Sequence, residues 1–375
     1  MKKIISLVSV MAILFSFTSC HKNQTYDSWR IVSSYNTTEN NKHGKFIVDQ
    51  ISSQLNFLDF KSMKQSLICD DPTCKHGSGC SSNGKNNHPF IYNDKLYYFK
   101  QTDTARDGDL YYMSSQLWQS DINGTNEKQI TEFKNLNYDH YDRLLLDGNM
   151  MYMCMYKQPF DKDFKTLEKT IELVSFNLDT NKIKNYGEIC KGYSSGSYID
   201  GKWNDCIVFH TSNSEDNRPY LEKVEDFAKE KGLSNDKAAE QFQDKYIYKY
   251  YKLDIKNDKI TDNDLPEPLE ITNSCYFYKD KDVLKYITQN NKTKEINVKN
   301  FDSIQSYGKY CLIACTKEVY IYNTETEEIL KYKDKYNDFT VNAEYEDYFI
   351  LEKFSADGTG STLEKAAVNE IGEKI

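Results

Sequence analysis

An internal repeat constrains the fold of this chain more than any other feature. A strand ends in an Asp or Asn, a short polar turn follows, and a second strand runs back. The repeat recurs at seven turns, and its copies at the fifth and seventh turns are less regular. The seven turns carry, in order, Asp59, Asp121, Asn177, Asp254, Thr288, Asn323 and Asp357. The last four turns follow one another at steps of 34 to 35 residues. Because repetition at this period indicates an array of similar units, we expect a fold built from repeated hairpins.

The segments that precede these turns have the composition of β-strands. They are rich in Tyr and β-branched residues and are alternating or wholly apolar. Clear examples are residues 95–99, 149–153, 206–209 and 310–314. Four-stranded units of this kind, repeated radially, form a β-propeller. We therefore predict an all-β fold, a β-propeller of about seven blades over residues 44–375. Six or eight blades remain alternatives, because the first and last half-blades can combine to close a ring.

The composition supports a large folded core and argues against a nucleic-acid partner. Aromatic residues make up 14% of the chain, with only 16 Gly and 6 Pro, which is unlike a disordered or fibrous chain. The net charge is -9, and only four of the 48 basic residues are Arg. Such a chain repels polyanions and has few bidentate phosphate ligands.

One copy of the repeat resembles a known family. Residues 117–131, from Leu117 to Thr131, contain a strand that ends in Asp-x-x-Gly-x-Asn and a second strand that closes on Thr. This pattern is similar to the repeat of TolB-like propellers, and the resemblance implies the propeller fold. It implies little about role, because one fold serves many functions.

The N-terminal sequence has the pattern of an export signal. Lys2 and Lys3 precede an apolar run over residues 4–17, which is too short to span a bilayer. The run ends in Phe-Thr-Ser-Cys at Cys20, which resembles the lipobox of bacterial lipoproteins, with Phe17 where that family usually has Leu. The resemblance implies a signal peptide over residues 1–20 and lipidation of Cys20, and two or more acyl chains hold a protein stably at a membrane. An ordinary cleaved signal with an incidental Cys is the alternative.

The predicted cellular location of the protein follows from this signal. We expect an extracytoplasmic, membrane-anchored lipoprotein at the cell surface or on the periplasmic face of a membrane. Residues 21–43 are polar and without periodicity, so they are expected to be a flexible tether.

A single segment departs from the strand pattern. Residues from about 219 to 244 place Leu221, Val224, Phe227 and Ala228 on one helical face, and Gly232 can end that helix. A second short helix follows from Ser234. We predict a helical hairpin inserted into a blade, either as a decoration packed on the rim or as a lid or partner surface over one mouth of the ring.

The closest group of potential metal-ligating or reactive side chains in the sequence lies in a loop of twelve residues. Cys69, Cys74, His76 and Cys80 supply three thiols and an imidazole, which are the soft ligands of a tetrahedral structural zinc site. A disulfide among the three cysteines is the alternative in an exported protein. A catalytic Cys and His pair is a third reading, but no residue nearby is evident to orient the imidazole. The stretch resembles a Cys-Asp-x-Pro-x-Cys-x-His signature of uncharacterised clostridial surface lipoproteins, which carries no activity to transfer.

The remaining cysteines and histidines are predicted to be structural. Six cysteines fall mostly in strand patterns, where a free Cys packs as a small apolar residue; they are Cys154, Cys190, Cys206, Cys275, Cys311 and Cys315. Four histidines stand alone in the sequence, where a surface or core role is more common than ligand binding; they are His43, His88, His140 and His210.

No motif of the common enzyme classes is present, so no catalytic residue is assigned. The leading reading is a lipid-anchored binding or interaction scaffold for a protein, peptide or glycan. The alternative is a propeller enzyme, a glycoside hydrolase or lyase, whose acidic residues converge in the central channel from different blades without any local motif. A structural subunit of an envelope complex is a third class. An enzyme predicts two or more acidic side chains with shifted pKa values that converge in a deep pocket, whereas a scaffold predicts an exposed apolar or aromatic patch.

Overall fold

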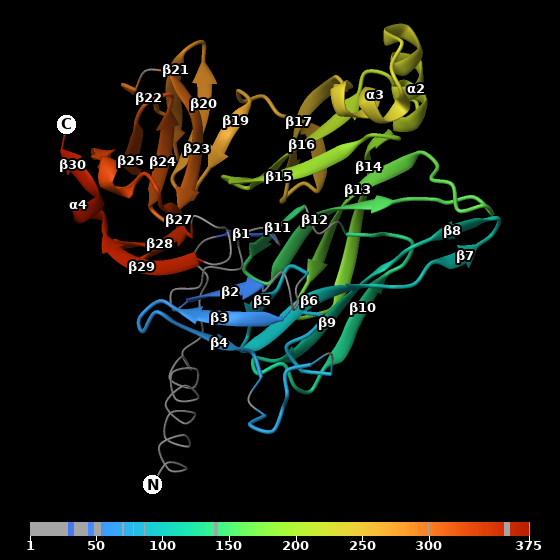
Figure 1. Ribbon diagram of the computed structural model, residues 1–375, viewed down its shortest axis with the longest axis horizontal. Helices are drawn as coiled ribbons and strands as arrows, with labels where there is room; N and C mark the ends of the chain where they lie inside the picture. Colours follow the sequence, from blue (N-terminus) through green and yellow to red (C-terminus); the bar gives the residue numbers. More distant parts are fainter. Residues whose placement is uncertain are drawn as a thin grey trace.

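The computed structural model describes residues 29–33, 44–48, 54–69, 71–77, 79–85, 87–138, 142–298, 300–355 and 361–374. Within them, seven antiparallel sheets stand around a common centre (Figure 1). The fold is therefore a seven-bladed β-propeller, as the repeat predicts. The first and last blades are separate sheets, so the six-blade alternative, in which they merge, is wrong.

The blades follow one another in chain order. Blade 1 contains β2 (Gly44–Val48), β3 (Leu55–Asp59) and β4 (Lys64–Leu67). Blade 2 contains β5 (Phe90–Tyr92), β6 (Lys95–Gln101), β9 (Ser115–Asp121) and β10 (Lys128–Phe133), with a projecting hairpin of β7 (Ala105–Asp107) and β8 (Leu110–Tyr112). Blade 3 contains β1 (Arg30–Ser33), β11 (Arg143–Asp147), β12 (Met150–Lys157), β13 (Lys169–Asn177) and β14 (Lys182–Gly192). Blade 4 contains β15 (Gly196–Trp203), β16 (Cys206–Ser214), β17 (Tyr246–Asp254) and β18 (Lys259–Asp262).

The C-terminal half is built in the same way. Blade 5 contains β19 (Pro268–Ile271), β20 (Cys275–Asp280), β21 (Val283–Thr288) and β22 (Thr293–Ile296). Blade 6 contains β23 (Phe301–Tyr307), β24 (Tyr310–Cys315), β25 (Val319–Asn323), β26 (Ile329–Tyr332) and β30 (Gly372–Lys374). Blade 7 contains β27 (Thr340–Tyr345), β28 (Tyr348–Phe354) and β29 (Ser361–Ala367). Short helical turns η1 (Asp334–Tyr336) and α4 (Val368–Ile371) precede β27 and β30, respectively.

Six of the seven predicted turns mark the outermost hairpin of a blade. Each joins the third strand of the meander to the fourth, or the second to the third in blade 1, while Asp357 lies outside the described residues. The Asp or Asn is favoured because its side chain accepts backbone N–H groups of the turn. Asn323 Oδ1, for example, accepts from the backbone of Glu325 and Thr326 at 2.9 and 3.1 Å.

Seven hydrophobic clusters hold the ring together, one between each pair of neighbouring blades. Taking the interfaces in order from blades 1 and 2 to blades 7 and 1, representative pairs are Leu55 and Leu96, Phe99 and Met151, Leu173 and Phe209, Val208 and Tyr276, Phe277 and Ile313, Ile321 and Phe349, and Ile350 and Leu58. Within the described residues no sheet contains strands of both blade 1 and blade 7, so side-chain packing closes the ring.

The start of the propeller differs from the prediction. Residues 21–43 were expected to form a tether before a propeller that begins at 44, but Arg30–Ser33 is a strand that pairs with β11 of blade 3. The reason is tertiary: the inner edge of β11 offers unpaired backbone groups, and Figure 1 shows β1 in the middle of the ring. Cys20 and the predicted signal peptide lie outside the described residues.

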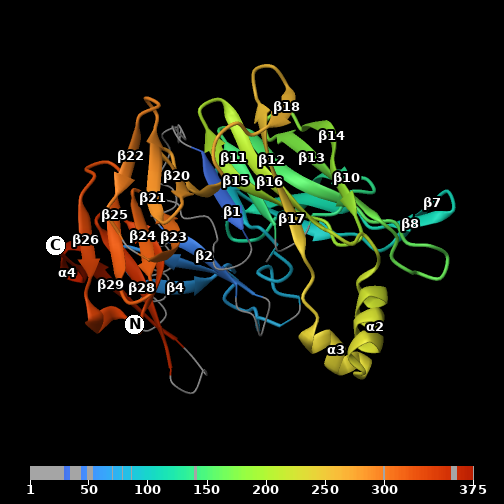
Figure 2. The same ribbon diagram turned by 90° about the horizontal axis from the view of Figure 1, so that it is seen from above.

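The helical insertion lies where the sequence places it, between β16 and β17 of blade 4. Helix α2 spans Tyr220–Lys231 and ends at Gly232, whose φ of 64° suits glycine, and α3 spans Asn235–Gln241. The two helices share a small core that includes Val224, Ala228 and Ala238. Figure 2 shows them projecting from the ring. No helix among the described residues is long and apolar enough to cross a membrane.

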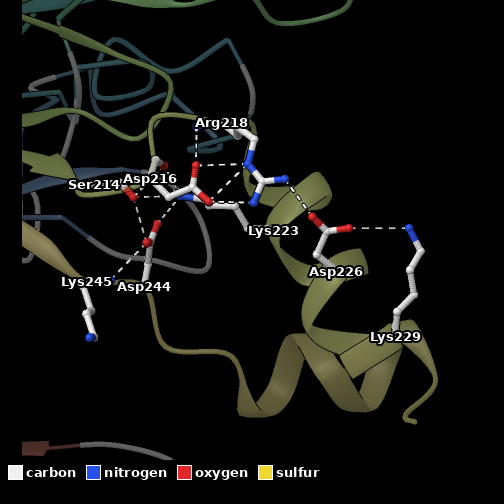
Figure 3. Close-up of polar contacts among 8 residues, drawn as sticks. All are labelled: Ser214, Asp216, Arg218, Lys223, Asp226, Lys229, Asp244 and Lys245. Carbon is white, nitrogen blue, oxygen red and sulfur yellow. Dashed lines mark hydrogen bonds and ion pairs between the residues drawn. The ribbon is translucent and has the colours of Figure 1, made fainter. Parts of the chain in front are cut away.

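A polar network fixes the base of the insertion to blade 4. The Lys223 ammonium, 2% exposed, donates to Ser214 Oγ at 2.9 Å and forms an ion pair with Asp244. Arg218 pairs with Asp216 at 2.7 Å and with Asp226 of α2 at 2.7 Å. Figure 3 shows this network. Because a buried ion pair with further hydrogen bonds holds a fixed geometry, the insertion is a rigid surface more than a movable flap.

Candidate metal centre and channel site

The predicted cysteine and histidine ligands meet in space. Cys69, Cys74, His76 and Cys80 each offer one ligand atom, and these four atoms all lie within 4.8 Å of one another. They belong to the connection between β4 of blade 1 and β5 of blade 2. All nine described cysteines are free thiols in the structure, so the three loop cysteines gather here without a bridge.

Local hydrogen bonds turn the chain so that the ligands converge. Asp71 Oδ1 accepts the backbone N–H of Thr73 at 2.8 Å, and its carbonyl accepts the N–H of Cys74 at 3.1 Å. The next turn is closed by the N–H of Cys80, which donates to the Gly77 carbonyl at 2.9 Å. Two short turns in succession thus bring residues from both ends of the loop to one point.

The donor set fits a tetrahedral metal ion. Zinc with bonds of about 2.3 Å to sulfur and about 2.0 Å to nitrogen places neighbouring ligand atoms roughly 3.5 to 3.8 Å apart. Cys80 Sγ lies 3.6 Å from His76 Nδ1. The cluster can therefore hold a metal ion with little rearrangement, and three thiolates with one imidazole are ligands that zinc prefers.

Cys80 has the environment of a stabilised thiolate. It is 6% exposed, and its Sγ lies 3.0 Å from Ser82 Oγ. Burial raises the pKa of the Cys80 thiol, but hydrogen bonds from the Ser82 side chain and backbone, His76 and Cys69 outweigh burial and lower the pKa to about 6.

The loop around the Cys and His cluster, which we call the metal loop, contacts the outer turn of blade 2. Ser81 Oγ donates to the Asn123 carbonyl at 3.4 Å, and the fully buried Lys85 forms an ion pair with Glu127. Gly124, with φ of 81°, has no room for a side chain, since a Cβ there would lie 2.7 Å from the Ser81 carbonyl oxygen. This contact gives a physical reason why this copy of the repeat retains its glycine.

A second polar group, not assigned from the sequence, lies on the inner strands of the ring. His210 of β16 places Nδ1 at 2.9 and 3.0 Å from the two carboxylate oxygens of Asp200 on β15. The Arg143 guanidinium of β11 lies 4.2 Å from the centre of the Tyr198 ring. Glu270 of β19 accepts a hydrogen bond from Ser306 of β23. We call these residues, which come from blades 3 to 6, the channel site.

Both carboxylates of the channel site have raised pKa values. Burial raises the pKa of Asp200, and the hydrogen bond and charge of His210 offset this only in part. Burial likewise raises the pKa of Glu270; Ser306 and Arg143 oppose the rise, and the charge of Asp200 adds to it. The charge of Asp200 on blade 4 therefore acts on Glu270 of the neighbouring blade 5.

The single histidines have different roles. His88 is buried, with Nε2 at 2.7 Å from the Asp142 carbonyl, so it is a satisfied core residue as predicted. His210 is isolated in the sequence, but in the structure it forms a hydrogen bond with Asp200 on the neighbouring strand. No local motif signals that pairing; the cross-strand register that creates it is known only once the blade is folded. His43 and His140 lie outside the described residues.

Aromatic side chains are exposed beside the insertion. Tyr220, Tyr246 and Tyr248 are 43%, 42% and 56% exposed, and we call them the insertion patch. Tyr246 is close enough to the other two for their charges to affect its pKa, which burial raises. Elsewhere, a surface hollow of about 350 Å³ lies between blades 6 and 7, lined by residues that include Tyr310 and Tyr348.

Comparisons with known proteins identify no family. No protein-family model matches the chain. No curated protein matches it either. Similar solved structures include an oligogalacturonate lyase from Vibrio parahaemolyticus, 9% identical with a TM-score of 0.44, covering 91% of this chain and 92% of the lyase. The propeller domain of the Trilobed protease from Pyrococcus furiosus is 12% identical with a TM-score of 0.42, over 90% of this chain and 98% of that domain.

A longer protein also matches. Dipeptidyl peptidase 4 from Porphyromonas gingivalis is 9% identical with a TM-score of 0.41, and the match covers 88% of this chain and 53% of the peptidase. This chain thus spans about half the length of that enzyme. At these scores the likenesses carry no conclusion about function, and the fold assignment stands on the seven sheets themselves.

Proposed function

We propose that the chain is a lipid-anchored, extracytoplasmic propeller that binds a protein, peptide or glycan. The observation that carries this proposal is the insertion patch, whose tyrosines stay 42% to 56% exposed beside a base held by a buried ion pair. Exposed aromatic rings on a rigid support suit recognition, because they bury large areas at low entropic cost.

The anchor rests on the sequence around Cys20. A Cys20→Ser variant is expected to move from the membrane pellet to the soluble fraction when cells are fractionated, because it cannot be lipidated. Retention of the variant in the pellet at the wild-type level would argue for attachment by another route.

A second candidate function is catalysis in the channel. The channel site favours it, because Asp200 and Glu270 combine raised pKa values with a histidine held by a carboxylate, which is how acid and base groups are prepared in enzymes. Acidic side chains with shifted pKa values are one of the two features that an enzyme predicts; the other is a deep pocket around them.

Binding and catalysis are separable by experiment. All described elements begin after residue 28, so a chain that starts at residue 21 keeps them all. On glycan and peptide arrays we expect this chain to be captured, and Tyr246→Ser with Tyr248→Ser to reduce capture at least tenfold. Tyr348→Ser, at a ring 37% exposed on blade 7, is the matched control and should bind normally. Release of cleaved product from the captured ligand would support the enzymatic function and reject the function of binding alone.

We further propose that the Cys and His cluster holds one structural zinc ion. The chain from residue 21, purified without oxygen or chelator, is expected to contain one equivalent of zinc, and Cys74→Ser should lose it because one of four ligands is gone. His76→Ala should loosen residues 69–80 and leave the propeller folded, since each interface has its own core. Absence of zinc together with one fewer pair of free thiols would identify a disulfide instead, and global unfolding of His76→Ala would contradict a local role.

A further inference from the structure

The N-terminal segment packs beside the channel site. Trp29, just before β1, packs against residues of blades 3, 4 and 5. A Cβ on Gly201 would lie 2.8 Å from the Trp29 ring, and Asn273 donates to the Trp29 carbonyl at 3.5 Å. Because Gly201 follows Asp200 directly, the indole lies near the channel site.

Aromatic rings surround the histidine on blade 4. The His210 ring centre lies 5.5 Å from that of Tyr198, 5.2 Å from that of Tyr250 and 6.0 Å from that of Tyr248. Tyr248 belongs to the insertion patch, so the aromatic surface runs without a break from the exposed patch to the channel site.

Two polar groups of this surface are available to a ligand. Nδ1 of His210 is held by Asp200, and Nε2 has no hydrogen-bond partner within the described part of the chain. Arg143 is held by Tyr198, and its charge acts on Asp200 and Glu270, but it forms no ion pair at contact distance with any described residue. Because a guanidinium has five N–H donors, Arg143 keeps donors for another molecule.

The combination favours one class of ligand. A sugar hydroxyl both donates and accepts, and here it meets carboxylate acceptors, guanidinium donors and an imidazole nitrogen at close quarters. Tyrosine rings offer flat apolar faces for the C–H faces of a pyranose. Apolar lipid would leave these charges unpaired, and a bound metal is disfavoured because the metal-ligand group found among the described residues is the Cys and His cluster.

We propose that the channel site, together with Tyr248 and Tyr250, binds a saccharide chain, with His210 and Arg143 as its main hydrogen-bonding residues. This rests on the proposed binding function and names its ligand class and its residues.

Titration calorimetry with hexasaccharides tests the proposal. The probes are a neutral glucan, a galacturonan and an N-acetylglucosamine oligomer, added to the chain from residue 21. We expect at least one to bind, and His210→Ala and Arg143→Ala each to weaken that binding at least tenfold, whereas Tyr348→Ala leaves it unchanged. Preference for the galacturonan would show that Arg143 meets a carboxylate, and preference for a neutral probe that it meets hydroxyls. Failure of all three probes, or unchanged binding in both channel variants, overturns the proposal.

A measurement on the unmodified chain guards against misfolded variants. Diethylpyrocarbonate modifies accessible imidazoles, and peptide mapping reports His210 separately. The bound hexasaccharide is expected to slow modification of His210 at least fivefold, and an unchanged rate would overturn the proposal. If the array experiment shows product release while His210 remains protected, the binding-only function fails and the saccharide site stands.

Discussion

Replacing Phe60 with alanine is expected to lower the free energy of unfolding by about 3–5 kcal/mol. Phe60 is fully buried where blade 1 meets blade 7, in the cluster with Leu58, Ala343 and Ile350. Its ring centre lies 5.7 Å from that of Tyr345. No described strand is shared by the two blades, so the cavity opens in the interface that closes the ring. Urea denaturation followed by circular dichroism measures the loss.

The matched control is Phe354→Ala in β28 of blade 7. Phe354 is 62% exposed, so its removal is expected to change the free energy of unfolding by less than about 0.5 kcal/mol. Equal losses in the two variants would mean that burial at the closure does not hold the ring.

The architecture is predictable because its signals are local. A propeller blade repeats a hairpin, and a side chain such as Asp254 caps its own turn through the N–H groups of Lys256 and Asn257, so each turn is visible in a short window. The uneven early spacing also has local causes. The metal loop and the β7–β8 hairpin lengthen the step from Asp59 to Asp121, and the helical insertion lengthens the step to Asp254.

The missed features depend on contacts between distant residues. Arg30–Ser33 has no strand partner of its own, and it becomes a strand only because β11, more than 100 residues later, offers an open edge. The Cys and His cluster was predicted as a candidate metal site because its four residues fall within twelve positions. Arg143 and Glu270 lie on the inner strands of blades 3 and 5, and only the packing of successive blades around the ring brings their charges together.

Lys45 is expected to make the stability of the ring depend on alkaline pH. It is 3% exposed in β2, and its ammonium donates to the carbonyl and side-chain oxygens of Asn342 in blade 7. Burial lowers the pKa of Lys45 to about 8, against the charge of Glu352, which raises it. The free amine in the unfolded chain has a pKa near 10.5.

The sign follows from proton binding. Between about pH 8 and 10.5 the unfolded chain holds a proton on Lys45 that the folded chain has lost, so the free energy of unfolding rises with pH. The rise amounts to about 3 kcal/mol over that interval, and it is absent below pH 8, where both states are protonated. Lys45→Met removes this contribution. The difference between the wild-type and variant unfolding free energies should therefore grow by about 3 kcal/mol from pH 7.5 to 10.5.

Taking the difference removes the titration of the many tyrosines, which the two proteins share. Lys353→Met is the matched control, because Lys353 lies on β28 of the same interface blade with an exposed side chain, paired with Asp338 at 3.5 Å. Its pH curve should run parallel to that of the wild type, since the Lys353 side chain is exposed and its replacement leaves Lys45 and Asn342 in place. A Lys45→Met curve that is also parallel would mean that Lys45 stays protonated in the folded ring, held by Asn342 and Glu352 more strongly than burial opposes it.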